Sequence, residues 1–231
     1  NVEQYGGSIG GPIIRDKLHF FAAGDFRHRV TPFSGPTIGS TTNVGITADS
    51  AERFSSILNG YGIAPGSFGA FNTTSDAQNV FAKLTAVTGK TGTAELSINY
   101  AHGITQDSIS PARAINGDYR LTSAAFAPEA TTWAGHGKWT TLFGDWSNEV
   151  LAGYAVTNEP RSTASTSPAI FVTNVGAAGT RLIAGADPSS QLLSLRQRDA
   201  ELTDNLTRSF GTHTVTVGAQ AELMHFTFGN F

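Results

Sequence analysis

The sequence predicts an all-β protein, an antiparallel meander of about eight long strands that forms part of a transmembrane β-barrel, with one short helix in an extracellular loop. Three observations lead to this prediction. Apolar and polar residues alternate over long runs, and the connections between these runs are alternately very short and very long. The composition, with 26 glycines and only 14% charged residues among 231, suits strands and turns better than helices.

The alternation is clearest in residues 94–100, where Ala94, Leu96, Ile98 and Tyr100 oppose Glu95, Ser97 and Asn99. Successive side chains of a strand point to opposite faces, so each such run has one apolar and one polar face. The apolar face is expected to meet lipid, and its members include Leu18, Phe20, Phe26, Leu96, Ile98, Val215 and Val217. The polar face is expected to line a wet lumen with His19, Asp25, Arg27, Arg29, Lys83, Glu95, Asn99, His136, Lys138, Glu149, Asp199, Glu201, Gln220 and Glu222.

The connections have two lengths. Short ones centre on residues 15–16, 88–92, 143–145 and 211–212, and long ones run roughly over 31–77, 105–130 and 158–190. Outer-membrane barrels have short periplasmic turns and long extracellular loops, so this rhythm favours such a barrel.

The first long connection contains the predicted helix. Asp49 is a candidate N-cap with Glu52 three residues later, and Gly60 can end the helix. Ala51, Phe54 and Leu58 share one face, which is expected to be buried.

Residues 196–207 fit a strand less well, because Asp204 shares a face with Ala200, Leu202 and Leu206. A carboxylate that faces lipid in the middle of a bilayer is costly. We therefore expect a β-bulge here, or a position near the membrane interface.

The run from Tyr5 to Phe21, YGGSIGGPIIRDKLHFF, resembles a segment of TonB-dependent outer-membrane receptors. It is most similar to the Oar-like group with a carboxypeptidase-regulatory-like N-terminal domain, in which a glycine-rich strand meets an Asp-Lys turn and an aromatic-rich strand. His19 stands where that group more usually has an aromatic residue. The glycines permit tight curvature and close approach of strands where a barrel wall bends.

The resemblance implies that residues 1–231 are one partial TonB-dependent receptor barrel, without the plug domain and the remaining strands. The intact protein would be a 22-stranded barrel that imports a bulky ligand, such as a siderophore, glycan or peptide, with energy relayed by the TonB complex through the plug. Its expected partners are outer-membrane lipid, TonB and an unknown imported ligand, and its expected location is the bacterial outer membrane. We expect the chain to continue beyond this segment.

Charge and residue content argue against several other functions. The net charge of −3 and pI of about 6.1 lack the positive field of a nucleic-acid binder, so no nucleic-acid partner is expected. The chain has no cysteine, which excludes disulfides and thiolate metal sites. No apolar run reaches the length of a membrane-spanning helix, so a membrane location would require strands.

No motif for catalysis, cofactor binding or metal binding stands out, so the protein is not expected to be an enzyme, and no catalytic, cofactor or metal residue is assigned. Gly89-Lys90-Thr91 is better explained as a hairpin turn than as a phosphate loop, and the six histidines have no metal-ligand spacing. Asp199 and Glu201 share a face, either as a carboxylate pair or as part of a hydrated wall. Arg27, Arg29, Arg196 and Arg198 could contribute positive groups to a channel. Arg27 and Arg29 share a face, and these groups would favour anionic ligands if they are not simply solvated.

The alternative architecture is a soluble extracellular β-sandwich with a binding or adhesion role. Strand length distinguishes the two, because tilted membrane strands need about 9–11 residues whereas strands of globular proteins cluster near 5–6. Several alternating runs here reach the longer value. Trp133, Trp139, Trp146 and Tyr154 are expected in an aromatic girdle at the bilayer interface, although stacking on a ligand is the other reading.

Overall fold

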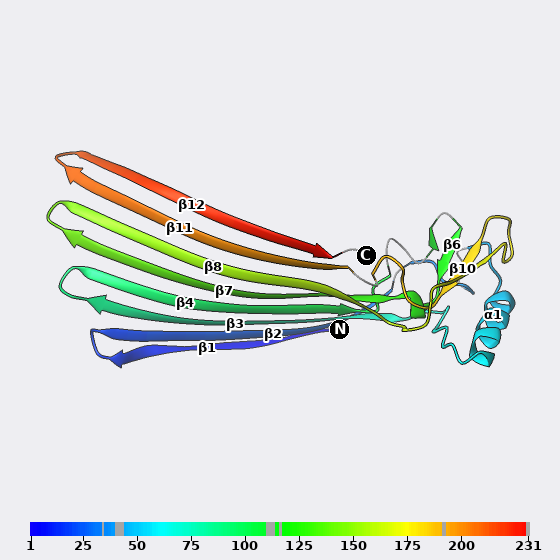
Figure 1. The fold of residues 1–231 in the computed structure, drawn as a ribbon. Helices are drawn as coiled ribbons and strands as arrows, with labels where there is room; N and C mark the ends of the chain where they lie inside the picture. Colours follow the sequence, from blue (N-terminus) through cyan, green and yellow to red (C-terminus); the bar gives the residue numbers. More distant parts are fainter. Residues whose placement is uncertain (34, 40–43, 110–113, 116, 191–192, 230–231) are drawn as a thin grey trace.

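The computed structural model describes residues 1–33, 35–39, 44–109, 114–115, 117–190 and 193–229. Two sheets form within this part of the chain. One is a long, curved antiparallel sheet, and the other is a small sheet that lies beyond one end of it together with a helix (Figure 1). The second sheet does not cover a face of the first, so the two do not form the sandwich of the alternative prediction.

The long sheet contains eight strands in the order β1-β2-β3-β4-β7-β8-β11-β12, each antiparallel to its neighbours. This confirms the predicted all-β meander. The strands are β1 (Val2–Ile14), β2 (Leu18–Pro32), β3 (Asn72–Thr88), β4 (Gly92–Gln106), β7 (Phe126–Phe143), β8 (Trp146–Thr163), β11 (Ser194–Phe210) and β12 (His213–Gly229). They have 13 to 18 residues, which is the length of membrane strands with extensions at their ends.

Four tight turns join the strands in pairs at one end of the sheet, as predicted (Figure 1). The turns between β3 and β4, β7 and β8, and β11 and β12 use Gly89, Gly144 and Gly211, whose φ angles are 69°, 61° and 58°. Asp16 occupies the same left-handed region with φ 61° between β1 and β2, where Asp is one of the residue types that tolerate it.

The glycine-rich run forms the β1–β2 hairpin. A side chain at Gly6 would place its Cβ 2.6 Å from the carbonyl oxygen of Gly24, so the two backbones require glycine there. The register shifts between Pro12 and Ile14. Pro12 lies on an edge strand of the described sheet, where a residue without a backbone N–H is tolerated.

β11 contradicts one expectation. Its register with β8 and β12 runs without a bulge past Asp204, so the first of the two expected explanations is wrong, and the position near the membrane interface stays a prediction. The Asp204 carboxylate instead accepts a hydrogen bond of 2.5 Å from the side-chain amide of Asn148 on β8. A polar partner on the neighbouring strand therefore lowers the cost of this carboxylate on the apolar face.

The three long connections fold together into one unit, which we call the cap: the described residues of 33–71, 107–125 and 164–193. Its sheet has the order β5-β6-β10-β9, and β6 and β10 are parallel. The strands are β5 (Ala114–Ile115), β6 (Asp118–Arg120), β9 (Ile170–Thr173) and β10 (Arg181–Ala184). This sheet was not predicted from the sequence, because strands of two to four residues carry almost no periodic signal.

Helix α1 (Ala48–Gly60) packs its predicted face, Ala51, Phe54 and Leu58, into the cap. Its N-cap is Thr47 and not Asp49, because the Thr47 hydroxyl accepts the Ser50 amide at 3.3 Å and Asp49 lies in the first turn. Among the described residues, no helix has the length and apolar character needed to cross a membrane.

The buried hydrophobic core of the described chain lies in the cap and not on the long sheet. It combines residues from all three connections: Ile38, Ile46, Ala51, Phe54, Leu58, Tyr119, Leu121, Leu182 and Ala184. The Tyr119 hydroxyl, 81 residues from Ile38 in sequence, accepts the Ile38 amide at 2.9 Å. The connections are therefore parts of one packed structure.

Candidate functional site

The polar face of the long sheet gathers the residues that the sequence predicted for it. Residues directly opposite one another in adjacent strands share a face. The registers link Asp25 to Asn79, Glu95 to Lys138, and Glu201 to Glu222. Followed from β2 to β12, they place all of the predicted residues on this one face: His19, Asp25, Arg27, Arg29, Lys83, Glu95, Asn99, His136, Lys138, Glu149, Asp199, Glu201, Gln220 and Glu222.

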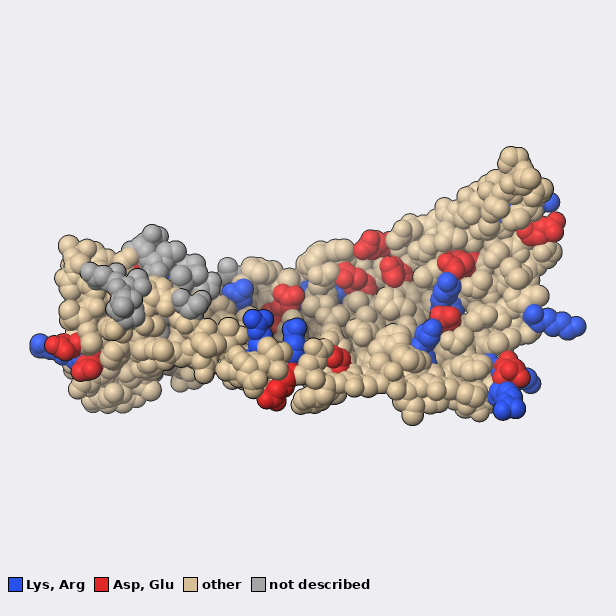
Figure 2. All heavy atoms as spheres, turned by 180° about the vertical axis from the view of Figure 1, so that it is seen from behind, with Lys and Arg blue, Asp and Glu red and all other residues tan. Residues whose placement is uncertain are grey.

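Four of these side chains form a ladder of alternating charge across β3, β4, β7 and β8. Lys83 Nζ lies 3.7 Å from Glu95 Oε2, and Lys138 Nζ lies 2.6 Å from Glu149 Oε2. Glu95 stands opposite Lys138 and joins the two pairs. Figure 2 shows basic and acidic side chains alternating in a line across the hollowed face of the sheet.

A second contact spans two strands. The Nδ1 atom of His136 on β7 lies 3.6 Å from Oε1 of Glu201 on β11, with β8 between them. Gly153 on β8 makes this possible, since a Cβ there would lie 2.5 Å from Glu201 Oε1. The absence of a side chain at position 153 thus lets a carboxylate cross the intervening strand.

The predicted carboxylates Asp199 and Glu201 are neighbours on this face, next to Glu222. Gln197 donates a hydrogen bond of 2.7 Å to Asp199 Oδ2, while Asp199 Oδ1 is buried without a protein partner. No group of three or more His, Asp or Glu side chains is placed to hold a metal ion within the described part of the chain.

Other predicted residues are less closely connected. Asp25 accepts a hydrogen bond of 2.8 Å from Gln4. His19 stands opposite Thr85, Asn99 opposite Phe81, and Gln220 opposite Thr203, without joining the ladder.

Towards the cap, the same face deepens into a hollow of about 560 Å³, a volume typical of ligand pockets. Its floor is a row of small residues, because Ala77, Gly103 and Ala130 stand opposite one another on β3, β4 and β7. The next row towards the cap is also short, with Ser75 opposite Thr105. The hollow was not predicted from the sequence, where its signal is the set of small residues Ala77, Gly103 and Ala130 at matching register.

Charged side chains border the floor on both sides. Arg27 and Arg29 come from β2, and Glu159 and Arg161 come from β8. Arg29 donates to the Thr31 hydroxyl at 3.0 Å, and the Arg161 guanidinium lies over the Phe126 ring at 5.3 Å. Leu195 and Phe228 add apolar walls from β11 and β12. The hollow therefore offers three guanidinium groups, the Glu159 carboxylate and apolar walls to a ligand.

The opposite face of the sheet is an exposed apolar surface. Leu96 and Val217 are 62% and 69% exposed, and the predicted lipid-facing residues all lie on this side. Trp133, Trp139, Trp146 and Tyr154 lie here as well, and so outside the hollow. An apolar surface of this extent is not expected to face water.

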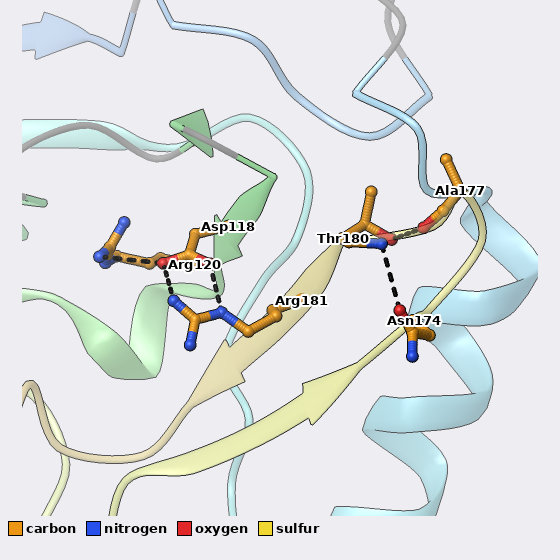
Figure 3. Close-up of polar contacts among 7 residues, drawn as sticks. Asp118, Arg120, Asn174, Ala177, Thr180 and Arg181 are labelled. Atoms are coloured by element: carbon orange, nitrogen blue, oxygen red, sulfur yellow. Dashed lines mark hydrogen bonds and ion pairs between the residues drawn. The ribbon is translucent and has the colours of Figure 1, made fainter.

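The cap is fastened by an ion pair between two of its strands. Arg181 on β10 donates two hydrogen bonds to Asp118 on β6, at 2.5 and 2.7 Å (Figure 3). These bonds raise the pKa of the Arg181 guanidinium further above its ordinary value, so the pair keeps its arginine charge throughout the physiological range. Nearby, Thr180 and Asn174 close the turn between β9 and β10.

No protein-family model matches the chain, and no curated protein matches it in sequence. Among solved structures, the outer membrane transporter YddB from Escherichia coli is similar with a TM-score of 0.63 and 11% identity. The likeness covers 97% of this chain but 25% of that chain, so the present sequence spans a quarter of the transporter's length. The chain therefore has the fold of one segment of an outer-membrane transporter.

Proposed function

We propose that this chain is part of the barrel of a TonB-dependent outer-membrane receptor, which takes up a bulky ligand across the bacterial outer membrane. The observation that carries the proposal is the division of the long sheet into two faces. Strands long enough to cross a bilayer present an apolar face on one side and a charged, hollowed face on the other. The glycine-rich run from Tyr5 to Phe21 supports the TonB-dependent, Oar-like assignment.

In this proposal the apolar face meets lipid and the polar face lines the lumen. The tight turns then lie on the periplasmic side and the cap outside the cell. TonB acts through a plug that belongs to the rest of the protein. The ligand passes the hollow, where Arg27, Arg29 and Arg161 favour anionic groups and where Leu195 and Phe228 contact its apolar parts.

Two glycines provide the test, one on each face. A side chain at Gly103 would project from the floor of the hollow, and one at Gly135 from the apolar face, and a Cβ at either meets its nearest neighbour only at 3.8 or 3.9 Å. G103F and G135F should therefore both assemble in the full-length receptor. Four strains are compared: cells with the wild-type receptor, cells with G103F, cells with G135F, and cells that have the wild-type receptor but lack TonB. The measurement is which solutes each strain removes from the growth medium.

We expect one class of solute to remain in the medium for both G103F and the TonB-deficient cells, and to be taken up by G135F. If G103F and G135F take up the solute equally and both are present in the outer membrane, the ligand does not pass through the hollow. Recovery of the full-length protein in the soluble fraction would reject the membrane assignment itself.

A further inference from the structure

The apolar face carries a cluster of basic and hydrogen-bonding side chains on β11 and β12, on the cap side of its apolar residues. Leu202 and Ala200 are followed on the same face by Arg198 and Arg196. The expectation that these two arginines contribute to a channel is therefore wrong, because they lie on the opposite face from Asp199 and Glu201. Opposite them on β12, Leu223 is followed by His225 and Thr227. Both strands thus change from apolar to basic as they approach the cap.

The registers bring these side chains together. Arg198 stands directly opposite His225, and Arg196 stands between Thr227 on β12 and Asn158 on β8. Opposed side chains in adjacent strands begin about 4.5–5.5 Å apart, so the whole cluster fits within one headgroup-sized area. Arg196, Arg198 and His225 are all exposed.

The charge of this cluster is not neutralised within the described protein. The nearest acidic residues along β11, Asp199 and Glu201, point to the other face of the sheet. On the apolar face itself, Asp204 lies six residues from Arg198 along β11 and accepts a hydrogen bond from Asn148. Asp76 is paired with His28 at 2.5 Å, and Glu129 lies 3.7 Å from His102. Neither Arg196 nor Arg198 forms an ion pair with any residue that the structure describes.

We propose that Arg196 and Arg198, with His225, Asn158 and Thr227 beside them, bind the phosphorylated headgroup of a membrane lipid whose chains lie along Leu202 and Leu223. The proposal rests on the proposed membrane location. Arginine suits this role because its planar fork of N–H donors matches phosphate oxygens. An arginine on a lipid-facing surface costs far less near the interface than at the bilayer midplane, so it is tolerated there.

The test uses the full-length protein, purified in a mild detergent and placed in phosphatidylcholine nanodiscs that contain lipid A. Native mass spectrometry counts the retained lipid A molecules for the wild type, R196Q/R198Q and R196K/R198K. The matched control is R27Q/R29Q, which removes two arginines with the same spacing from the opposite face.

Since each basic residue near an anionic surface contributes about a fivefold change in affinity, R196Q/R198Q should retain lipid A about 25-fold more weakly. R27Q/R29Q should retain it like the wild type, and R196K/R198K should lie between the wild type and the glutamine variant. Lipid A without its phosphates should be retained equally by all of these proteins.

Equal retention by the wild type and R196Q/R198Q, or an equal loss in R27Q/R29Q, would overturn the proposal. So would equal binding of phosphorylated and stripped lipid A. These outcomes are separate from failure of the proposed function, because a receptor that is in the membrane but lacks this site would still show the uptake defect of G103F.

Discussion

His136 and Glu201 lie 3.6 Å apart although a whole strand separates them, and Gly153 on that strand is the residue over which the carboxylate passes. His136 and Glu201 each stand directly opposite Gly153, one from either side, on the hollowed face of the sheet (Figure 2). Gly153 thus leaves the space that the Glu201 carboxylate needs to approach His136.

The His136–Glu201 contact should therefore depend on Gly153. In a double-mutant cycle with H136Q and E201Q, we expect a coupling of about 0.2–1 kcal/mol, because both side chains are nearly half exposed. In a G153A background the new Cβ displaces Glu201, so the coupling should fall to zero. Urea unfolding of the full-length protein in detergent measures this coupling energy. An unchanged coupling in G153A would show that the contact does not depend on a glycine at position 153.

An arginine should impair membrane insertion at one of two neighbouring positions of β4 and not at the other. Ile98 belongs to the apolar face and Ser97 to the polar face. I98R should cost about 2–4 kcal/mol near the bilayer midplane and reduce assembly, whereas S97R should assemble normally. Heat-modifiable mobility of the full-length protein measures the folded fraction. Equal assembly of the two variants would contradict the assignment of the faces.

The charge ladder should respond to a reversal at its centre. K138E places a third carboxylate between Glu95 and Glu149, and we expect a loss of about 1 kcal/mol in unfolding free energy. The second change in K138E/E149K restores one attractive pair but leaves Glu95 facing a carboxylate, so it should recover part of the loss. Both effects should shrink in 1 M salt, since the ladder is partly exposed. A loss that is independent of salt would point to packing instead of charge.

The long sheet was predictable because period-two alternation acts on every strand, and a residue such as Ile98 or Glu95 reveals its face from its neighbours alone. The four turns were predictable for a similar reason, since Asp16, Gly89, Gly144 and Gly211 mark them locally. The cap sheet was not, because β6 and β10 owe their pairing to contacts between residues about 60 positions apart, such as Asp118 and Arg181. The hollow was not predicted, because it depends on the strand register that places Ala77 opposite Gly103.

Tyr119 should be the residue on which the fold of the cap most depends. Its side chain is 1% exposed, and its hydroxyl accepts the Ile38 amide and donates to the Phe68 carbonyl at 2.5 Å. Y119F keeps the ring but leaves both backbone groups without this partner, at a cost of about 1–3 kcal/mol. Hydrogen exchange of the full-length protein should therefore show faster exchange in the cap, at the Ile38 amide first, and unchanged protection in the strands of the long sheet. Y61F provides the control, because Tyr61 follows α1 in the same cap and is 80% exposed. If Y119F and Y61F exchange alike, the hydroxyl does not hold the cap together and its stability comes from the apolar core alone.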